Sequence, residues 1–178
     1  METILDLKTG KISGEVTASE RHIADLAGLF ADEAARAALP QDTVVYRVEM
    51  HDKEKEGTPG GLLFGTSFVY PGKVGSEYFM TKGHFHAKRD TAEYYFCIAG
   101  KGALILMDEA GKCWAEPMHP GTLHYIPRSV AHRLANTGDE VLAVGCCWGA
   151  DCGHDYASIA QTGFSKRLLD VNGEPQLV

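Results

Sequence analysis

Apolar and polar positions divide the chain into a helical N-terminal segment and a long series of strands. Residues 19–39 are rich in alanine, and their larger apolar residues recur at i, i+3 and i+7, at Ile23, Leu26 and Phe30. Ser19 is a candidate N-cap, and Pro40 ends the segment. Because Gly28 lies inside the segment, we expect two short helices here.

Short strand-like runs follow Pro40 and continue almost to the end of the chain. Turns containing Gly or Pro separate them, and the runs are 44–50, 61–70, 78–81, 93–99, 103–107, 113–117, 122–127 and 141–148. Such regular spacing of strands and turns is typical of a β-sandwich or a small closed barrel. The central part of the chain is therefore predicted to be all β.

Both ends of the chain add smaller elements to this pattern. Residues 1–15 indicate a short hairpin with Gly10 in its turn, and residues 155–178 indicate one short helix, around 156–161, and a final strand. We accordingly assign residues 1–40 to an N-terminal extension with short helices. Residues 41–178 form the barrel, and the whole chain is a single structural domain.

Composition narrows the class of protein. The chain has 178 residues, 44% of them hydrophobic, and a formal net charge of −7, which argues against nucleic acid or an anionic membrane as the main partner. No apolar run approaches a membrane span, and the acidic N-terminus lacks the basic region of a signal peptide. Five cysteines without CxxC spacing indicate reduced thiols, so we expect a cytoplasmic protein.

The stretch from Gly83 to Glu93, Gly-His-Phe-His-Ala-Lys-Arg-Asp-Thr-Ala-Glu, carries the strongest chemical signal. His84 and His86 are two residues apart, so both point to the same face of a strand, and Glu93 opens the next strand-like run. Two imidazoles and a carboxylate would be costly to bury together without a shared cation. We therefore predict a metal site.

His132 is the candidate fourth ligand. It lies in the pattern Gly-x5-Pro-x4-His-x3-Asn, where the Gly and Pro delimit a strand and the histidine follows a turn. The simpler alternative is a loop histidine that hydrogen-bonds Asn136, and His124 is a lower-ranked candidate for the same place. Three imidazoles and a carboxylate complete a ligand set for a divalent transition metal. The remaining isolated histidines are expected to be ordinary core or surface residues: His22, His51 and His119.

These two motifs, His-x-His-x6-Glu-x6-Gly and Gly-x5-Pro-x4-His-x3-Asn, resemble the paired motifs of the cupin superfamily, whose fold is an antiparallel jelly-roll β-barrel with one metal. Longer segments resemble the archaeal-type, cupin glucose-6-phosphate isomerases, which also occur in some bacteria: 44–46, 70–75, 81–88, 131–133, 150–156 and 163–166. The resemblance extends from about residue 40 to residue 168. The motifs alone imply a fold and a metal, and the longer segments imply the reaction.

The resemblance implies an isomerase of glycolysis and gluconeogenesis that interconverts glucose 6-phosphate and fructose 6-phosphate. It implies one divalent metal per chain, held by His84, His86, Glu93 and His132, and a homodimer. Family similarity favours iron(II), Fe2+, although such a ligand set also accepts Mn2+, Ni2+, Co2+ or Zn2+. Glu93, Tyr95 and His132 are the expected catalytic residues, with Glu93 as metal ligand and general base. Because metal coordination weakens a base, a metal-stabilised cis-enediolate and a hydride shift both stay open.

The resemblance also implies the residues that contact the sugar phosphate. For the phosphate they are hydroxyls, a glycine amide and an imidazole: Tyr46, Thr66 or Ser67, Thr81, Gly83 and His154. Such groups bind a dianion with little formal charge, which suits an acidic chain. Tyr95 faces the same side as Glu93, and Trp148 stands where the family pattern has a tyrosine, so an aromatic wall is kept and a hydroxyl is lost.

Two other functions compete with the isomerase. A non-haem iron cupin dioxygenase would use a closely similar ligand set, but it would leave Tyr46, Thr81 and His154 without a purpose. A non-catalytic sugar- or metal-binding cupin would tolerate loss of Glu93, which is present.

Overall fold

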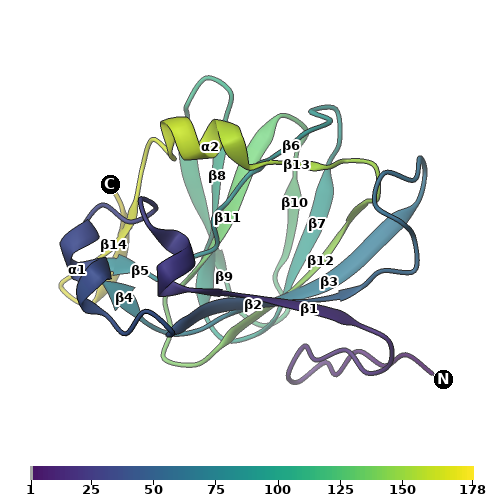
Figure 1. Ribbon diagram of the computed structural model, residues 1–178, viewed down its shortest axis with the longest axis horizontal. Coiled ribbons are helices and arrows are strands. Elements are labelled where there is room, and N and C mark those ends of the chain that lie inside the picture. The colour runs from purple at the N-terminus through teal and green to yellow at the C-terminus, as the bar shows by residue number, and fades with distance from the viewer. Residues whose placement is uncertain (1) are drawn as a thin grey trace.

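The computed structural model describes residues 2–178, and antiparallel strands form most of its regular secondary structure (Figure 1). The largest sheet has six strands in the order β1 (Thr17–His22), β2 (Val44–His51), β3 (Leu62–Val69), β12 (Leu142–Gly149), β7 (Glu93–Ala99) and β10 (Leu123–Ile126). Every pairing in it is antiparallel. The mainly β, antiparallel fold expected for a cupin is thus confirmed.

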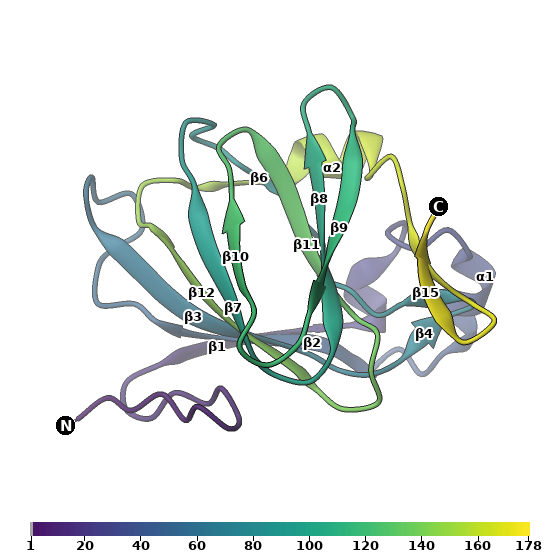
Figure 2. The same cartoon turned by 180° about the vertical axis from the view of Figure 1, so that it is seen from behind.

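Three smaller sheets complete the β structure. One faces the large sheet and has the order β11 (Val130–Asn136), β8 (Gly102–Asp108) and β9 (Cys113–Met118). Another pairs β13 (His154–Asp155) with β6 (Phe85–His86), and the last has the order β15 (Glu174–Leu177), β14 (Leu168–Val171), β5 (Glu77–Tyr78) and β4 (Lys73–Val74). Figure 2 shows the two principal sheets curving around one interior, although no backbone ladder joins them within the described residues.

Three helical segments lie at the margins of the sheets: η1 (Ile23–Leu26, a 3-10 helix), α1 (Glu33–Ala38) and α2 (Tyr156–Thr162). In Figure 1, α2 crosses one end of the two facing sheets, and η1 and α1 lie beside β4 and β5. The helix expected around 156–161 is confirmed. Within residues 2–178 no helix combines the length and the apolar character needed to span a membrane.

The core fills the space between the two principal sheets. Strand β7 shows why: Glu93, Tyr95 and Cys97 are buried on its inner face, whereas Tyr94 between them is exposed. This is the alternation that a sheet with one covered face requires. Because successive residues point to opposite faces, the register of β7 determines which polar side chains enter the interior.

The N-terminal segment differs from the expectation. Ser19 lies in β1, which pairs with β2 at the edge of the large sheet, so the prediction of a helix beginning there is wrong. Ile23 and Leu26 are buried as the helical period suggested, but in a 3-10 turn. The regular helix starts later, where Asp32 accepts a hydrogen bond from the Ala35 amide at 2.8 Å. Residues 17–22, assigned to the extension, are part of the large sheet.

The N-terminal hairpin is confirmed. Leu5 and Ile12 form an isolated antiparallel bridge, and Gly10 in the turn has φ +77°. A Cβ at Gly10 would lie 2.9 Å from the Thr66 methyl group, so the glycine allows the turn to approach the sheet closely. The hairpin lies outside the large sheet (Figure 1), where Leu5 packs against a small cluster containing Phe68 and Ile98.

Candidate metal centre and substrate cavity

Four side chains that could hold a metal ion meet between the two sheets. They are His84, His86, Glu93 and His132, and one ligand atom from each lies within 4.8 Å of the others. His86 belongs to β6, Glu93 begins β7, and His132 is the third residue of β11. His84 immediately precedes β6 and pairs with His132 in an antiparallel bridge. The structure therefore brings together all four residues predicted as ligands, from three strands and the residue before β6.

Thr91 fixes the orientation of the His86 ring. The Thr91 hydroxyl donates to the Lys88 carbonyl at 2.7 Å, so it accepts a hydrogen bond from His86 Nδ1 at 2.8 Å. The Thr91 carbonyl lies 3.3 Å from the same nitrogen. With a proton held on Nδ1, Nε2 is the nitrogen that faces Glu93, and a neutral ring would present its Nε2 lone pair to a metal ion there, as in the carboxylate- or carbonyl-supported histidines of metal sites.

The atoms that face one another at the centre are not satisfied by the protein. Glu93 Oε1 lies 2.5 Å from His132 Nε2 and 3.5 Å from His86 Nε2. Among the described residues these three atoms are fully buried and lack a hydrogen bond of acceptable geometry. Buried polar atoms without partners are rare in proteins. A divalent cation bound at this point would satisfy all three, so the donor set fits the metal expected from the sequence.

Burial and mutual charge shift the pKa values of these groups. Burial lowers the pKa of His84 well below its usual value, and the neighbouring His132 lowers it further. Burial also opposes the charge on Glu93, but His132 and His86 outweigh it and lower the pKa of the carboxyl. Glu93 is therefore a carboxylate at neutral pH, as a ligand and a base must be.

A cavity of about 170 Å³ adjoins this cluster on the inner face of the large sheet. Six of the residues that line it carry side chains able to contact a substrate: Ser67, Glu93, Tyr95, Trp148, His154 and Tyr156. Burial and the Glu93 charge raise the pKa of Tyr95 well above its usual value, so its hydroxyl stays protonated. The cavity thus has aromatic walls and a few directed polar groups.

Tyr156 was not among the residues predicted from the sequence. Its ring stacks on His154 at 5.7 Å between centroids and lies 5.2 Å from the His84 ring. Tyr156 directly follows β13, and His154 in that strand is the register partner of His86. The segment 150–156, which carried part of the family resemblance, contains this tyrosine and was the available signal.

Strand alternation decides between Thr66 and Ser67. Ser67 lines the cavity, whereas Thr66 points to the opposite face of β3, toward the N-terminal hairpin at Gly10. The register explains this, because Ser67 pairs with Val48 and Val144, both turned toward the interior. Of the two alternatives, Ser67 is the one placed beside the cavity.

The other predicted phosphate contacts surround a different part of the interior. Thr81 accepts a hydrogen bond from the Leu134 amide at 3.1 Å, and its backbone donates to the Leu134 carbonyl. Tyr46 is buried, which raises its pKa to about 12. Gly83 has φ +74°, and a Cβ there would lie 2.8 Å from Phe164 and 2.9 Å from Arg133 Nε. None of these three lines the 170 Å³ cavity directly.

His124 is not part of the cluster. Its side chain is buried, with Nδ1 2.7 Å from the Glu116 carboxylate and Nε2 2.9 Å from the Thr122 hydroxyl. Because both ring nitrogens have partners, the residue has no lone pair available for a metal. It connects β10 in the large sheet with β9 in the facing sheet. The five cysteines are all free.

Comparison with known proteins gives a consistent result over nearly the whole chain. The family model described as glucose-6-phosphate isomerase (GPI) matches residues 20–176. The chain is 46% identical over 175 residues to the glucose-6-phosphate isomerase of Thermococcus onnurineus (strain NA1), covering 98% of this chain and 91% of that protein. It is 40% identical over 174 residues to the protein of the same name from Sinorhizobium medicae (strain WSM419), covering 96% and 80%.

Among solved structures, oxalate decarboxylase from Bacillus subtilis at pH 4.6 aligns with 61% of this chain and 26% of its own, at 22% identity and a TM-score of 0.48. The assignment of a family rests on the sequence matches.

Proposed function

The chain belongs to the glucose-6-phosphate isomerase family and interconverts glucose 6-phosphate and fructose 6-phosphate, and we propose that this reaction takes place in the 170 Å³ cavity beside the four clustered side chains. The observation that carries the proposal is the convergence of three unpaired, buried donor atoms at the wall of that cavity. The dioxygenase and the non-catalytic cupin are not favoured, because the matched relatives are named glucose-6-phosphate isomerase and are covered over 91% and 80% of their own length.

The metal is a divalent cation held by His84, His86, Glu93 and His132, and we propose iron(II) as the resident ion. Three imidazoles and a carboxylate suit several first-row metals, so Mn2+, Ni2+, Co2+ or Zn2+ would also bind. When bound, the cation supplies Lewis-acid stabilisation of the negative charge that develops on the two oxygens of the sugar. The chain's own residues must then bind the substrate, exclude water and move the proton.

Glu93 is the residue placed to move that proton. Its carboxylate is buried at the cavity wall, and its lowered pKa keeps it unprotonated. In the proposed path it takes a proton from C2 of open-chain glucose 6-phosphate and returns it to C1, while the proton of the C2 hydroxyl passes to O1, so that the carbonyl group moves from C1 to C2. The Tyr95 hydroxyl, from the same face of β7, orients the substrate oxygens or Glu93. The lowered pKa makes Glu93 a weak base, which is why a hydride shift from C2 to C1 is the competing path.

Isotope exchange separates these two paths. If Glu93 carries the proton, turnover in D2O introduces deuterium at C1 of fructose 6-phosphate, because a carboxylic acid exchanges with solvent. A hydride shift transfers the substrate hydrogen directly and leaves the product free of solvent deuterium. Mass spectrometry of product at low conversion distinguishes them.

The substrate phosphate is proposed to bind beside Ser67 and His154. Ser67 and His154 line the cavity, and Tyr46, Thr81 and Gly83 are the remaining members of the proposed set. Trp148 forms the wall next to His154, with 6.5 Å between ring centroids. Ser67→Ala and His154→Gln are therefore expected to raise KM for fructose 6-phosphate more than they lower kcat, because phosphate binding is uniform along the reaction.

The direct test is an assay with controlled metal content. Purified protein is incubated with glucose 6-phosphate, and fructose 6-phosphate is followed before chelation, after chelation, and after each divalent metal is restored. Activity that disappears on chelation and returns with metal supports the proposal. No turnover with any divalent metal would overturn it, and oxygen consumption without isomerisation would favour the dioxygenase.

We also propose that the chain acts as a homodimer in the cytoplasm, in glycolysis and gluconeogenesis. An apolar surface on the outer side of β7 and β10 supports the dimer: Tyr94, Leu123 and Tyr125 are exposed, and the two tyrosine rings lie 5.2 Å apart. Exposed apolar patches of this kind are typical of interfaces. Light scattering after gel filtration tests it, with Leu123→Lys expected to shift the mass to that of one chain. A wild-type monomer would contradict it.

A further inference from the structure

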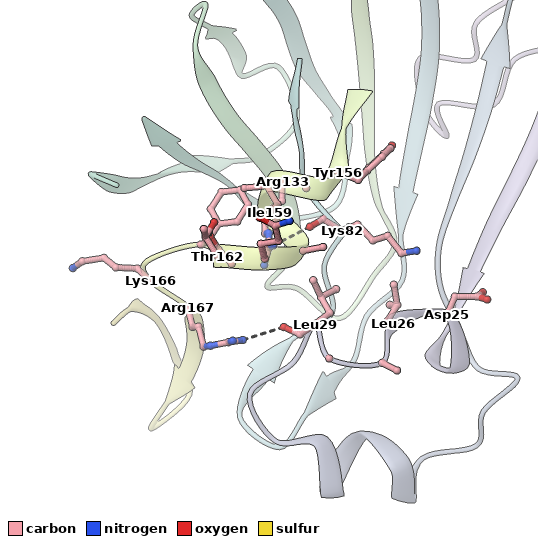
Figure 3. Close-up of a pocket in the computed structure, with 17 residues that line it drawn as sticks. Asp25, Leu26, Leu29, Lys82, Arg133, Tyr156, Ile159, Thr162, Lys166 and Arg167 are labelled. Atoms are coloured by element: carbon pink, nitrogen blue, oxygen red, sulfur yellow. Dashed lines mark hydrogen bonds between the residues drawn. The ribbon is translucent and has the colours of Figure 1, made fainter. Parts of the chain in front are cut away.

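A second and larger cavity lies between η1 and α2. Its volume is about 500 Å³, within the range of small-molecule sites. We call it the η1–α2 cavity. None of the four clustered metal-ligand candidates lines it, and of the residues around the smaller cavity only Tyr156 is shared. Gly83 of the proposed phosphate set also lines it, on the side of its backbone that faces Phe164 and Arg133. Figure 3 shows Leu26 and Leu29 on one side and Ile159 and Thr162 of α2 on the other.

The wall of this cavity is basic although the chain is acidic. Its charged side chains are Lys82, Arg133, Lys166, Arg167 and Asp25, so four cations and one carboxylate line it in a chain of net charge −7. Arg167 is compensated, since it donates to the Glu77 carboxylate at 2.8 Å. Within residues 2–178, Lys82, Arg133 and Lys166 form no ion pair. Lys166 extends away from the cavity (Figure 3), so Lys82 and Arg133 are the two positive charges at the cavity without an ion-pair partner.

Arg133 is the more unusual of the two. It is 95% buried, its Nε has no hydrogen-bond partner in the described chain, and its other nitrogens donate to the Lys82 carbonyl at 2.8 Å and to Met80 Sδ at 3.2 Å. Its guanidinium stacks on the Phe164 ring at 4.0 Å. A buried cation without a carboxylate is costly unless something supplies negative charge.

The η1–α2 cavity and the metal-ligand cluster lie on opposite sides of the β11 backbone. His132 and Arg133 are neighbours on β11, so His132 points to the interior and Arg133 toward the cavity. Lys82 and Gly83 directly precede His84, and the Lys82 carbonyl is held by Arg133. Lys82 extends across the cavity toward η1, whereas Lys166 extends away from it (Figure 3).

We propose that the η1–α2 cavity is a second ligand site, separate from the isomerase cavity, that takes a small phosphate monoester with a carbon skeleton. Lys82 binds the phosphate directly, and the Arg133 charge beneath the floor adds long-range attraction. The apolar walls formed by Leu26, Leu29 and Ile159 contact the carbon skeleton. The residues that line this cavity are chain neighbours of two metal-ligand candidates, since Gly83 precedes His84 and Arg133 follows His132. Occupation of the cavity therefore changes isomerase turnover.

Binding stoichiometry tests the proposal directly. Glycerol 3-phosphate carries the phosphate monoester and has no carbonyl group to isomerise, so it is the probe. Titration calorimetry of the metal-loaded protein is expected to give two bound molecules per chain, one in each cavity. Lys82→Gln is expected to weaken the second site by about tenfold or more, as for loss of a charge-assisted hydrogen bond. Lys166→Gln is the matched control, and we expect it to retain both sites.

A second variant removes space and leaves every charge unchanged. Ala160 lies on α2, is exposed and lines the cavity. Ala160→Trp should fill the cavity and remove the second site even if Lys82→Gln fails to fold. Inhibition patterns give an independent readout: glycerol 3-phosphate should inhibit the wild type in a mixed fashion and both variants in a purely competitive fashion.

One bound molecule per chain in the wild type, with purely competitive inhibition, would overturn the proposal. So would equal binding by Lys82→Gln and Lys166→Gln. A chain that binds two probe molecules but does not isomerise would instead contradict the proposed function and leave this site in place.

Discussion

His84 and His132 are bonded to each other through their backbones, each amide donating to the carbonyl of the other at 3.2 and 3.1 Å. Directly paired residues of an antiparallel bridge place their side chains on the same face. Their rings accordingly lie 4.5 Å apart, before any metal is considered. Two of the four ligands are thus positioned by the main chain itself.

Replacing Glu93 is expected to damage catalysis and metal binding together. Glu93→Ala should abolish measurable turnover, and Glu93→Gln, which keeps the shape, should lower kcat by roughly 10²- to 10⁴-fold, the range for a lost general base. Metal affinity, measured by calorimetry, should fall in both. Glu140→Gln, a change at an exposed position, is the control and should alter neither. Unaffected turnover in either Glu93 variant would remove this residue from the mechanism.

Thr91 is expected to control metal affinity without touching the metal. Thr91→Val removes the hydroxyl that accepts from His86 Nδ1 at 2.8 Å, so the ring loses its tautomer and orientation. Loss of such a supporting contact costs about 10- to 100-fold in affinity. Thr91→Ser retains the hydroxyl and should restore tight binding in the same calorimetric titration. If valine and serine give equal affinities, the orienting role of Thr91 is excluded.

The stabilising effect of metal is expected to grow with pH. Burial acts to lower the pKa of His86, but the neighbouring Cys152 and the facing Glu93 carboxylate outweigh it and raise the pKa to about 10 in the metal-free protein. The extra proton therefore stabilises the metal-free fold fully below the unfolded pKa of about 6.5, and this contribution is lost as pH rises through about 10. A metal ligand must be unprotonated, so the metal-loaded protein lacks the stabilisation that this proton provides.

The measurement is thermal unfolding with and without Co2+ from about pH 7 to about pH 9.5, a window set by the two pKa values. The difference in Tm between loaded and chelated protein should widen steadily. If the Tm difference between loaded and chelated protein stays constant or narrows over this range, the extra proton does not lie on His86.

Gly83→Ala is expected to destabilise the protein by roughly 2–4 kcal/mol. The left-handed backbone accounts for about 1–2 kcal/mol, and the new Cβ, 2.8 Å from Phe164, adds an overpacking term. Gly60→Ala is a matched control, because Gly60 has φ +75° and no atom within 4 Å of the added Cβ. Urea unfolding of both variants separates the two contributions, and equal losses would show that the contact with Phe164 is readily relieved.

Sequence patterns were sufficient to predict the metal-ligand candidates, because these depend on local spacing. His84 and His86 face one interior because a two-residue step keeps the side of a strand. Glu93 faces the same interior from β7, which lies in a different sheet from β6. His132 could be placed beside them because a strand, a turn and a following strand have predictable lengths. Burying two imidazoles and a carboxylate together is costly without a cation, and this cost led to the prediction of a metal site.

The same reasoning failed where the outcome depends on distant contacts. The apolar period of residues 19–39 is real, but β1 forms because the edge of β2 is available to it, which no local pattern records. The choice of Ser67 over Thr66 needed the register of β3. The η1–α2 cavity could not be predicted at all, since it exists only where Lys82, Arg133 and α2 meet.

Glu93 and His132 belong to different sheets, and no backbone ladder connects those sheets within the described residues. A cation coordinated by both residues would therefore hold the two halves of the barrel at a fixed separation, in addition to its part in the chemistry. Metal content would then set the mechanical coupling between the layers. Chelation should accelerate hydrogen–deuterium exchange where β7 and β11 approach each other, while the β8–β9 ladder within one sheet stays protected.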